Sequence, residues 1–223
     1  DETGNIYGIV NENKIPDFPK TDILFFIGED TRAKGCAKVA ADVLKAAGVE
    51  FTILKDEPLS GYSLDFLIGA AAETKAMMEN CAKTLNEYKK VICYDPTDAK
   101  VMMREYKEWG IEVTAEVVTF TSFLAELIEK GALKVKKSDK VYTPQDSPIL
   151  ARDLEETEAI RTILSACGSV RDMLLSKKDT VLAGNLIMNE YMPDVMAKVA
   201  DMRWINAKNA NAEILVTECF AEY

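Results

Sequence analysis

This 223-residue chain contains no histidine, so any chemistry must use its five scattered cysteines, its 37 carboxylates, lysine, tyrosine, backbone groups or a bound cofactor. Without histidine, the chain alone cannot form a Ser-His-Asp or Cys-His catalytic group, and it cannot ligate zinc or haem through imidazole. Cys219 follows a predicted strand, but Glu218 and Glu222 beside it disfavour a reactive thiolate. The other cysteines fall on predicted elements and are interpreted as small core residues; they are Cys36, Cys81, Cys93 and Cys167.

The net charge and the cysteine content argue against a nucleic-acid-binding protein and against a secreted, disulfide-bonded one. A net charge of −10 argues against nucleic-acid binding, which requires a basic surface. Five cysteines without a Cys-x-x-Cys pair suit a reducing compartment. We find no signal-peptide pattern, and the longest apolar runs, such as Ile23–Ile27, are too short to span a bilayer. We therefore expect a cytoplasmic protein, and because it begins at Asp1 rather than Met, a processed product or a fragment.

Strands and helices alternate along the predicted chain. In the first half, strands are predicted at 22–27, 49–54, 91–93 and 112–119, and helices at 34–47, 64–88, 99–109 and 120–130. In the second half, strands are predicted at 141–142, 180–182 and 213–217, and helices at 153–166 and 193–209. Strands separated by helices of ten or more residues indicate a doubly wound parallel α/β sheet of the Rossmann or flavodoxin-like kind.

The two halves share a spacing that indicates an internal repeat. Leu59-Ser60-Gly61 is matched 123 residues later by Leu182-Ala183-Gly184, and Asp95-Pro-Thr-Asp98 is matched 124 residues later by Cys219-Phe-Ala-Glu222. Glu29, after the first strand, is roughly matched by Pro148. Any one of these loops is explained by turn residues alone, but three matched spacings favour duplication. Since each loop lies near the carboxyl end of a strand, we expect two halves facing a shared cleft.

These patterns divide the chain into four predicted parts. They are an N-terminal arm at 1–20, a first α/β half at 21–133, a lysine-rich linker at 134–140 and a second half at 141–223. After Asp98 the first half adds a helix, a strand and another helix, whereas the second half stops one residue after Glu222. An incomplete second half would expose an apolar strand edge. We expect a fragment, a split subunit or a domain that a partner completes.

The repeat and its flanking segments resemble the cysteine-rich (CCG) domain found in the B and D subunits of heterodisulfide reductase. The same domain occurs in iron–sulfur subunits of anaerobic glycerol-3-phosphate dehydrogenase, glycolate oxidase and lactate-utilisation proteins. That family carries two copies of a lone Cys, then Cys-Cys-Gly, then Cys-x-x-Cys. The resemblance covers nearly the whole chain and includes four segments: Gly4-Asn-Ile-Tyr-Gly8, Asp22-Ile-Leu-Phe-Phe-Ile-Gly28, Phe123-Leu-Ala-Glu-Leu-Ile-Glu-Lys-Gly131 and Ala212-Glu-Ile-Leu-Val-Thr217.

The resemblance implies that this chain has lost nearly all of the family's cluster ligands. In the first half, Glu29 stands at the lone Cys, Leu59 and Ser60 at Cys-Cys, and Asp95 and Asp98 at Cys-x-x-Cys. In the second half, Pro148 stands at the lone Cys, Leu182 and Ala183 at Cys-Cys, and Cys219 and Glu222 at Cys-x-x-Cys. Only Cys219 keeps a thiol, whereas an iron–sulfur cluster needs about four Cys ligands. We therefore expect no cofactor in this chain, with the iron–sulfur clusters of the family held by its partners.

Three of the replacements are carboxylates, which allows other chemistry. Glu29, Asp95 and Asp98 are a candidate site for Mg, Mn or Ca, which prefer oxygen ligands. A carboxylate pair acting as general acid and base is a further alternative. Against both, Leu59 and Ser60 close the same pocket. We favour an ordinary turn in which Asp98 caps a helix beginning at Ala99.

Three functions follow, of which the first is favoured. It is a cluster-free, non-catalytic scaffold or subunit of an electron-transfer complex in anaerobic-type redox metabolism, forming a hetero-oligomer with redox subunits such as a ferredoxin-type domain. The second is an enzyme or a binder of a small molecule or divalent metal, with a cleft lined by Glu29, Asp95, Asp98, Ser60, Tyr62, Asp146 and Glu222. The third is an electron-transfer protein with clusters outside this segment. The methionines fill a core or form a partner interface; they are Met77-Met78, Met102-Met103 and those from Met188 to Met202.

Overall fold

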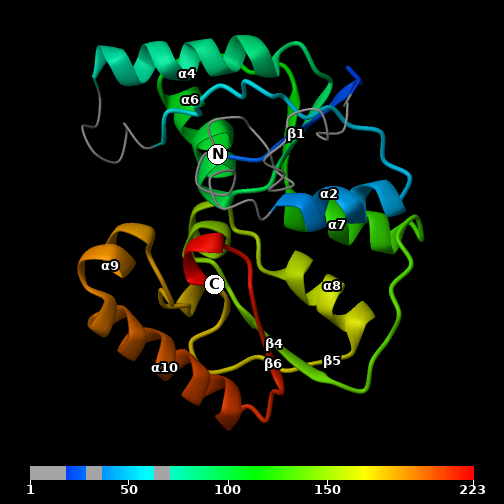
Figure 1. Cartoon of the computed structure of the whole chain (residues 1–223), viewed down its shortest axis with the longest axis vertical. Helices are drawn as coiled ribbons and strands as arrows, with labels where there is room; N and C mark the ends of the chain where they lie inside the picture. Colours follow the sequence, from blue (N-terminus) through cyan, green and yellow to red (C-terminus); the bar gives the residue numbers. More distant parts are fainter. Residues whose placement is uncertain (1–18, 29–36, 63–70) are drawn as a thin grey trace, which may run out of the picture. The chain divides into compact units, whose positions relative to one another are not determined.

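The computed structural model describes residues 19–28, 37–62 and 71–223 (Figure 1). Glu29, Cys36 and the first 18 residues of the predicted arm lie outside these described residues. The chain divides into two compact units, residues 1–123 and 124–223. Both units contain parallel strands and helices, which confirms the predicted α/β fold.

The first unit is built on a parallel sheet of β1 (Ile23–Phe26), β2 (Lys90–Cys93) and β3 (Glu116–Thr119), in that order. An isolated bridge joins Thr52 to Leu24 on the other edge of β1. The segments therefore follow the order second, first, third and fourth across the sheet, as in flavodoxin-like folds. The strand predicted at 49–54 is reduced to this bridge.

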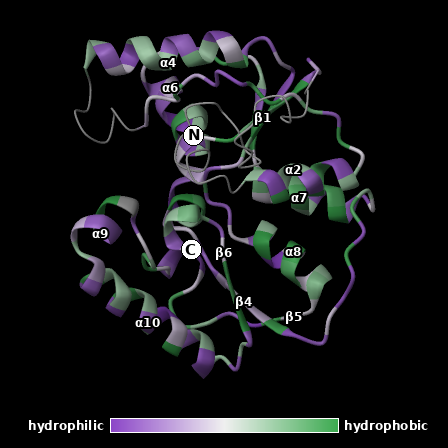
Figure 2. Cartoon of the chain, in the orientation of Figure 1, coloured by the Kyte–Doolittle hydropathy of each residue, from purple (hydrophilic) through white to green (hydrophobic). Residues whose placement is uncertain are grey.

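The apolar run of β1 forms the core of the first unit. Leu24, Phe25 and Phe26 are fully buried, because strands of a covered parallel sheet have no solvent-facing side. The Phe25 ring meets Phe51 and Tyr94 edge to face, with centroids 5.7 and 5.8 Å away. Figure 2 shows this strand in the colour of hydrophobic residues.

Where the structure describes them, the helices of the first unit differ from the predicted ranges mainly at their ends; residues 34–36 and 64–70 of the predicted helices lie outside the described residues. The helices are α2 (Ala37–Ala46), α4 (Ala72–Leu85), α5 (Pro96–Lys100), a π-helical turn (Val101–Glu105) and α6 (Tyr106–Glu108). Helix α7 (Phe120–Glu129) crosses the boundary between the two units, which falls after Phe123. The predicted cap is wrong: Asp95 caps α5 by accepting the Thr97 amide, and Asp98 lies inside the helix. The reason is Pro96, which favours the first helical position and so starts the helix three residues earlier.

The second unit repeats the strand order of the first. Its parallel sheet consists of β4 (Val141–Gln145), β5 (Ser169–Val170) and β6 (Ile214–Thr217), in the order β5-β4-β6. Helices α8 (Glu158–Cys167) and α10 (Pro193–Asn209) lie on opposite sides of β4 and β6 (Figure 1). The bounds of α10 are those predicted. The helix predicted at 153–166 begins later, after a π-helical turn at Ile149–Asp153, and α9 (Leu186–Tyr191) was not predicted.

The strand predicted at 180–182 is wrong, and β5 takes its place in the sheet. The backbone there bonds to side chains instead of a neighbouring strand. Arg152 donates to the Thr180 carbonyl, Gln145 donates to the Val181 carbonyl, and the Ala183 amide donates to Glu222. The segment is thereby held as a loop.

No helix within the described ranges has both the length and the apolar character needed to cross a membrane.

Candidate functional site at the carboxyl ends of the strands

In the first unit, two of the predicted site residues are joined directly. The Ser60 hydroxyl donates a hydrogen bond to Oδ1 of Asp98, although 38 residues separate them. Both side chains are buried. The Tyr106 hydroxyl donates to the Ser60 carbonyl at 2.7 Å and fixes the loop on α6. The Ser60 hydroxyl thus binds a neighbouring carboxylate in the protein interior.

The remaining first-unit positions have different environments. Asp95 is buried, and its carboxylate accepts the Thr97 amide at 2.7 Å as the cap of α5. Leu59 is 40% exposed and has no polar group to offer. Glu29 lies outside the described residues, so the carboxylate metal site of Glu29, Asp95 and Asp98 stays a prediction.

A residue that the sequence did not single out, Glu57, holds the end of β1. Its two carboxylate oxygens accept the backbone amides of Ile27 and Gly28, each at 2.9 Å. Backbone amides at a strand end bind a carboxylate well, because each contributes a charge-assisted hydrogen bond. No spacing in the sequence distinguishes Glu57 from other surface acids, and only the fold reveals this contact.

Gly28 permits the close packing around Asp98, which gives a prediction. Its φ is +89°, and an added Cβ would lie 2.3 Å from Oδ2 of Asp98. We expect Gly28→Ala to lower the free energy of unfolding by about 2–4 kcal/mol, from backbone strain and overpacking together. Urea unfolding measures this loss.

Gly48 provides a matched control for Gly28. Its φ is +74°, but nothing lies within 4 Å of an added Cβ. Gly48→Ala should therefore lower the free energy of unfolding by backbone strain alone, about 1 kcal/mol. Equal losses for the two variants would contradict the close approach of Asp98 to Gly28.

In the second unit, the corresponding positions, Glu222 and Ala183, are joined by a hydrogen bond from the Ala183 backbone. The Ala183 amide donates to Oε1 of Glu222 at 3.0 Å, and the Gln145 side-chain amide donates to the same oxygen at 3.2 Å. Burial raises the pKa of Glu222 to about 7. Gly184 packs so closely that an added Cβ would lie 2.2 Å from the Ala221 carbonyl oxygen.

The other second-unit positions lie on the surrounding loops. Cys219 is half-buried and directly precedes a 3₁₀ turn at Phe220–Glu222. Pro148 directly precedes the π-helical turn of Ile149–Asp153. Leu182 is 38% exposed. Cys219 is therefore the one thiol at any of these positions that the structure describes.

Arg203 is 1% exposed and is linked to Glu222 through the side chain of Gln145. Its Nε donates to Oε1 of Gln145 at 2.6 Å, and its two terminal nitrogens donate to the carbonyls of Leu174 and Leu175. Gln145 therefore connects a buried guanidinium to the Glu222 carboxyl. Nothing in the residue pattern of α10 distinguishes a buried arginine from an exposed one, so the sequence does not reveal this group.

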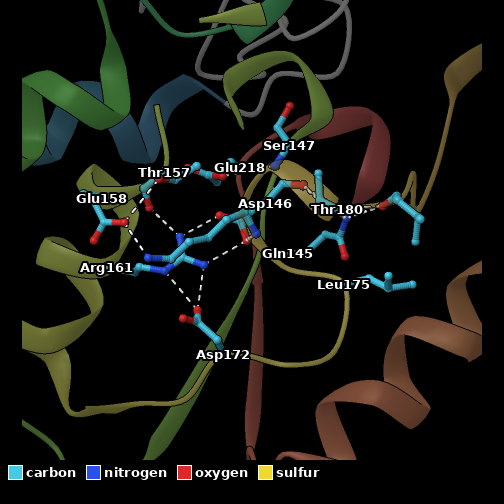
Figure 3. Close-up of polar contacts among 12 residues, drawn as sticks. Gln145, Asp146, Ser147, Thr157, Glu158, Arg161, Asp172, Leu175, Thr180 and Glu218 are labelled. Carbon is cyan, nitrogen blue, oxygen red and sulfur yellow. Dashed lines mark hydrogen bonds and ion pairs between the residues drawn. The ribbon is translucent and has the colours of Figure 1, made fainter. Parts of the chain in front are cut away.

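A second buried arginine, Arg161, binds two carboxylates (Figure 3). It contacts both oxygens of Asp146, at 2.7 and 2.9 Å, and Oδ1 of Asp172, at 2.6 and 2.9 Å. The backbone amide of Lys177 also donates to Asp146, at 2.7 Å. Asp146 was expected to line a cleft; instead it is completely buried, because Arg161 neutralises it inside the second unit.

Glu218 is the third acid at this end of the second sheet. Its Oε2 accepts the Ser147 amide at 3.1 Å, while its buried Oε1 has no hydrogen-bond partner among the described residues. Burial raises the pKa of Glu218 to about 8. Burial therefore brings the titration of Glu218 and Glu222 close to neutral pH, whereas Asp146, at the same end of the sheet, forms an ion pair with Arg161.

These residues do not fit an iron–sulfur cluster. A cluster needs about four thiolates, and the side chains at the described positions are mostly aliphatic, hydroxyl or carboxyl groups. Cys81 and Cys93 are core residues, as predicted, and burial raises the pKa of the Cys81 thiol to about 12. Cys167, also predicted to be a core residue, is only half-buried. Among the residues that the structure describes, no group of three or more His, Cys, Asp or Glu side chains is placed to hold a metal ion.

Comparison with known proteins gives three relatives and no matching family model. The chain is 29% identical to the D subunit of the dihydromethanophenazine:CoB–CoM heterodisulfide reductase of Methanosarcina acetivorans, over 98% of this chain and 56% of the relative. It is 29% identical to the probable iron–sulfur-binding oxidoreductase FadF of Bacillus subtilis, over 67% of this chain and 22% of the relative.

The third relative is a probable membrane-anchored ferredoxin of Chromohalobacter salexigens, 26% identical over 91% of this chain and 32% of the relative. The chain thus spans between about a fifth and just over half of the length of these proteins. These similarities confirm the resemblance to heterodisulfide-reductase-like proteins.

Proposed function

We propose that this chain, a relative of heterodisulfide reductase and of iron–sulfur oxidoreductases, is a cluster-free form of the cysteine-rich domain and acts as a non-catalytic scaffold in a redox complex. Its homologues indicate a family of iron–sulfur redox and electron-transfer proteins. The loss of the clusters and the scaffold role are the parts that we infer from the site.

The observation that carries the proposal is the pair of contacts at the former ligand positions. The Ser60 hydroxyl donates to the Asp98 carboxylate in the first unit, and the Ala183 backbone amide donates to the Glu222 carboxyl group in the second. In the family pattern, each pair joins the second Cys of Cys-Cys-Gly to the last Cys of Cys-x-x-Cys. The acids at the last position, Asp98 and Glu222, therefore accept hydrogen bonds from within the protein, where the cysteines of the family pattern would bind iron.

The register of the paired strands also supports a duplication of the two units. Phe26 pairs with Cys93 across β1 and β2, and Gln145 pairs with Thr217 across β4 and β6. The lone-Cys positions, Glu29 and Pro148, come three residues after Phe26 and Gln145, and the Cys-x-x-Cys positions begin two residues after Cys93 and Thr217. Equal offsets from paired residues are expected if both units descend from one ancestral unit.

The proposed scaffold role follows from the lack, at the described positions, of side chains that could bind a catalytic iron–sulfur cluster. Cluster-mediated disulfide cleavage needs iron, which these residues do not fit. In such a complex, the iron–sulfur centres would be held by partner subunits or by other domains, and this chain would position them. Ferredoxin-type domains are the partners we propose, since one relative is called a ferredoxin.

Iron analysis tests the proposal. The full 223-residue chain, produced in iron-replete anaerobic cells and purified without oxygen, should contain no stoichiometric iron. Its visible spectrum should lack the charge-transfer band at about 400 nm that thiolate-bound clusters give. A brown protein whose absorption bleaches on adding dithionite would contradict the proposal.

A further inference from the structure

Helix α10 has a buried face and an apolar outward face. Met196, Arg203 and Ala207 are buried against the second unit. On the outward side, Val195, Val199, Met202 and Ile205 follow the i, i+4, i+7, i+10 spacing of a continuous helical stripe. Val195, Met202 and Ile205 are 44%, 57% and 48% exposed. We call these four residues the α10 stripe.

Four charged side chains border the α10 stripe, and all four are exposed: Asp194, Lys198, Asp201 and Lys208. None of them forms an ion pair within the described parts of the chain. Their signs run negative, positive, negative, positive along the helix. An apolar stripe with alternating charges is typical of a helix that pairs with another helix.

We propose that the α10 stripe binds the α10 stripe of a second copy of this chain, with the two helices antiparallel. An antiparallel pair centred near residue 200 places Val195 against the partner's Ile205 and the Met202 side chain against the stem of the partner's Lys198. In the same register, Lys198 lies beside the partner's Asp201, and Asp194 lies beside the partner's Lys208.

Charge selects this arrangement over the parallel one. In a parallel pair of identical helices, each flank of the stripe faces the opposite flank of the partner. The four charges lie on one flank, at 100° per residue, so in a parallel pair they would meet no opposite charge. In the antiparallel pair, each of the four charges meets an opposite charge, and the two-fold symmetry doubles these contacts. Flanking charges of this kind set the orientation of paired helices.

The expected dimer is reversible. One helix per subunit buries less surface than the interfaces of stable dimers, which exceed about 1,200 Å² in total. We therefore expect association at concentrations of roughly 10–100 µM. Sedimentation velocity of the full chain across this range should show monomer and dimer in exchange.

Charge exchange at the centre of the helix tests the geometry. Lys198→Glu and Asp201→Lys should each weaken self-association about tenfold, because each places like charges together twice in the dimer. The double variant K198E/D201K restores opposite charges across an antiparallel interface and should recover wild-type association. These positions lie in the middle of α10, so the helix macrodipole affects them little.

A hydrophobic control completes the experiment. Met202→Glu should leave the chain monomeric at every concentration, while Val39→Glu, at a 71% exposed site on α2, should dimerise as the wild type does. Circular dichroism checks that each variant is folded. A monomeric wild type, or a double variant that stays as weak as the single ones, would overturn the proposal.

Discussion

Replacing Arg161 by alanine is expected to lower the free energy of unfolding by about 3–5 kcal/mol, the loss typical of removing one partner of a buried ion pair. Asp146 is completely buried and binds the guanidinium through both oxygens. Without Arg161, this carboxylate remains in the protein interior with no cation to neutralise it. Urea unfolding at pH 7, followed by circular dichroism, measures the loss.

Two further variants separate the ion pair from a general effect of losing an arginine. Arg171 lies in the same unit, is exposed and makes one 3.3 Å contact, so Arg171→Ala should change the stability by no more than about 0.5 kcal/mol. Combining Arg161→Ala with Asp146→Asn removes the unpaired charge and should recover part of the loss. A double variant no more stable than Arg161→Ala would contradict an electrostatic origin.

The stability of the second unit should fall as pH rises from 5 to 9. Burial raises the pKa of Glu218 to about 8 and that of Glu222 to about 7, from 4.5. Over that window the native state binds more protons than the unfolded state, so raising the pH favours unfolding. Each unit of pKa contributes about 1.4 kcal/mol, and the two acids together should cost several kcal/mol by pH 9.

A urea-unfolding series across this pH range tests the prediction, with Glu218→Gln as the informative variant. The amide keeps an oxygen for the Ser147 amide but cannot ionise, so the variant should be more stable than the wild type at pH 8 and less sensitive to pH. Glu158→Gln is the control, since Lys177 lowers the pKa of that exposed acid. Identical pH profiles for wild type and Glu218→Gln would contradict a protonated Glu218.

The sequence predicted those strands and helices whose bounds depend on the residues within and directly beside them. The apolar run Ile23–Ile27 lies between Asp22 and Gly28, so its strand was expected, and Pro193 marks the start of α10. Two predictions were wrong, the helix cap at Asp98 and the strand at 180–182, because neighbouring residues or distant side chains determine the structure there. Pro96 moves the cap from Asp98 to Asp95. Side chains of Gln145, Arg152 and Glu222 hold 180–183 as a loop where a strand was expected.

The candidate site was predictable only in part, because its polar contacts join residues distant in sequence. Repeat spacing identified Ser60, Asp98, Ala183 and Glu222, and the structure shows what they contact. The repeat spacing gave no indication of Arg203, whose partner Gln145 is 58 residues away, or of Glu57, which is 29 residues from Gly28. Charged residues are expected at the surface, so burial of these groups follows only from the complete fold.

Restoring the cysteines tests most directly whether these loops are former cluster sites. The variant P148C/L182C/A183C/E222C, with native Cys219, carries the complete family pattern in the second unit. After anaerobic incubation with ferrous iron and sulfide, we predict bound iron and absorption at about 400 nm in this variant and neither in the wild type. A control with four cysteines on α10, D194C/K198C/D201C/K208C, should bind no cluster. A wild type that takes up stoichiometric iron, or a folded restored variant that takes up none, would contradict the loss of a cluster from these loops.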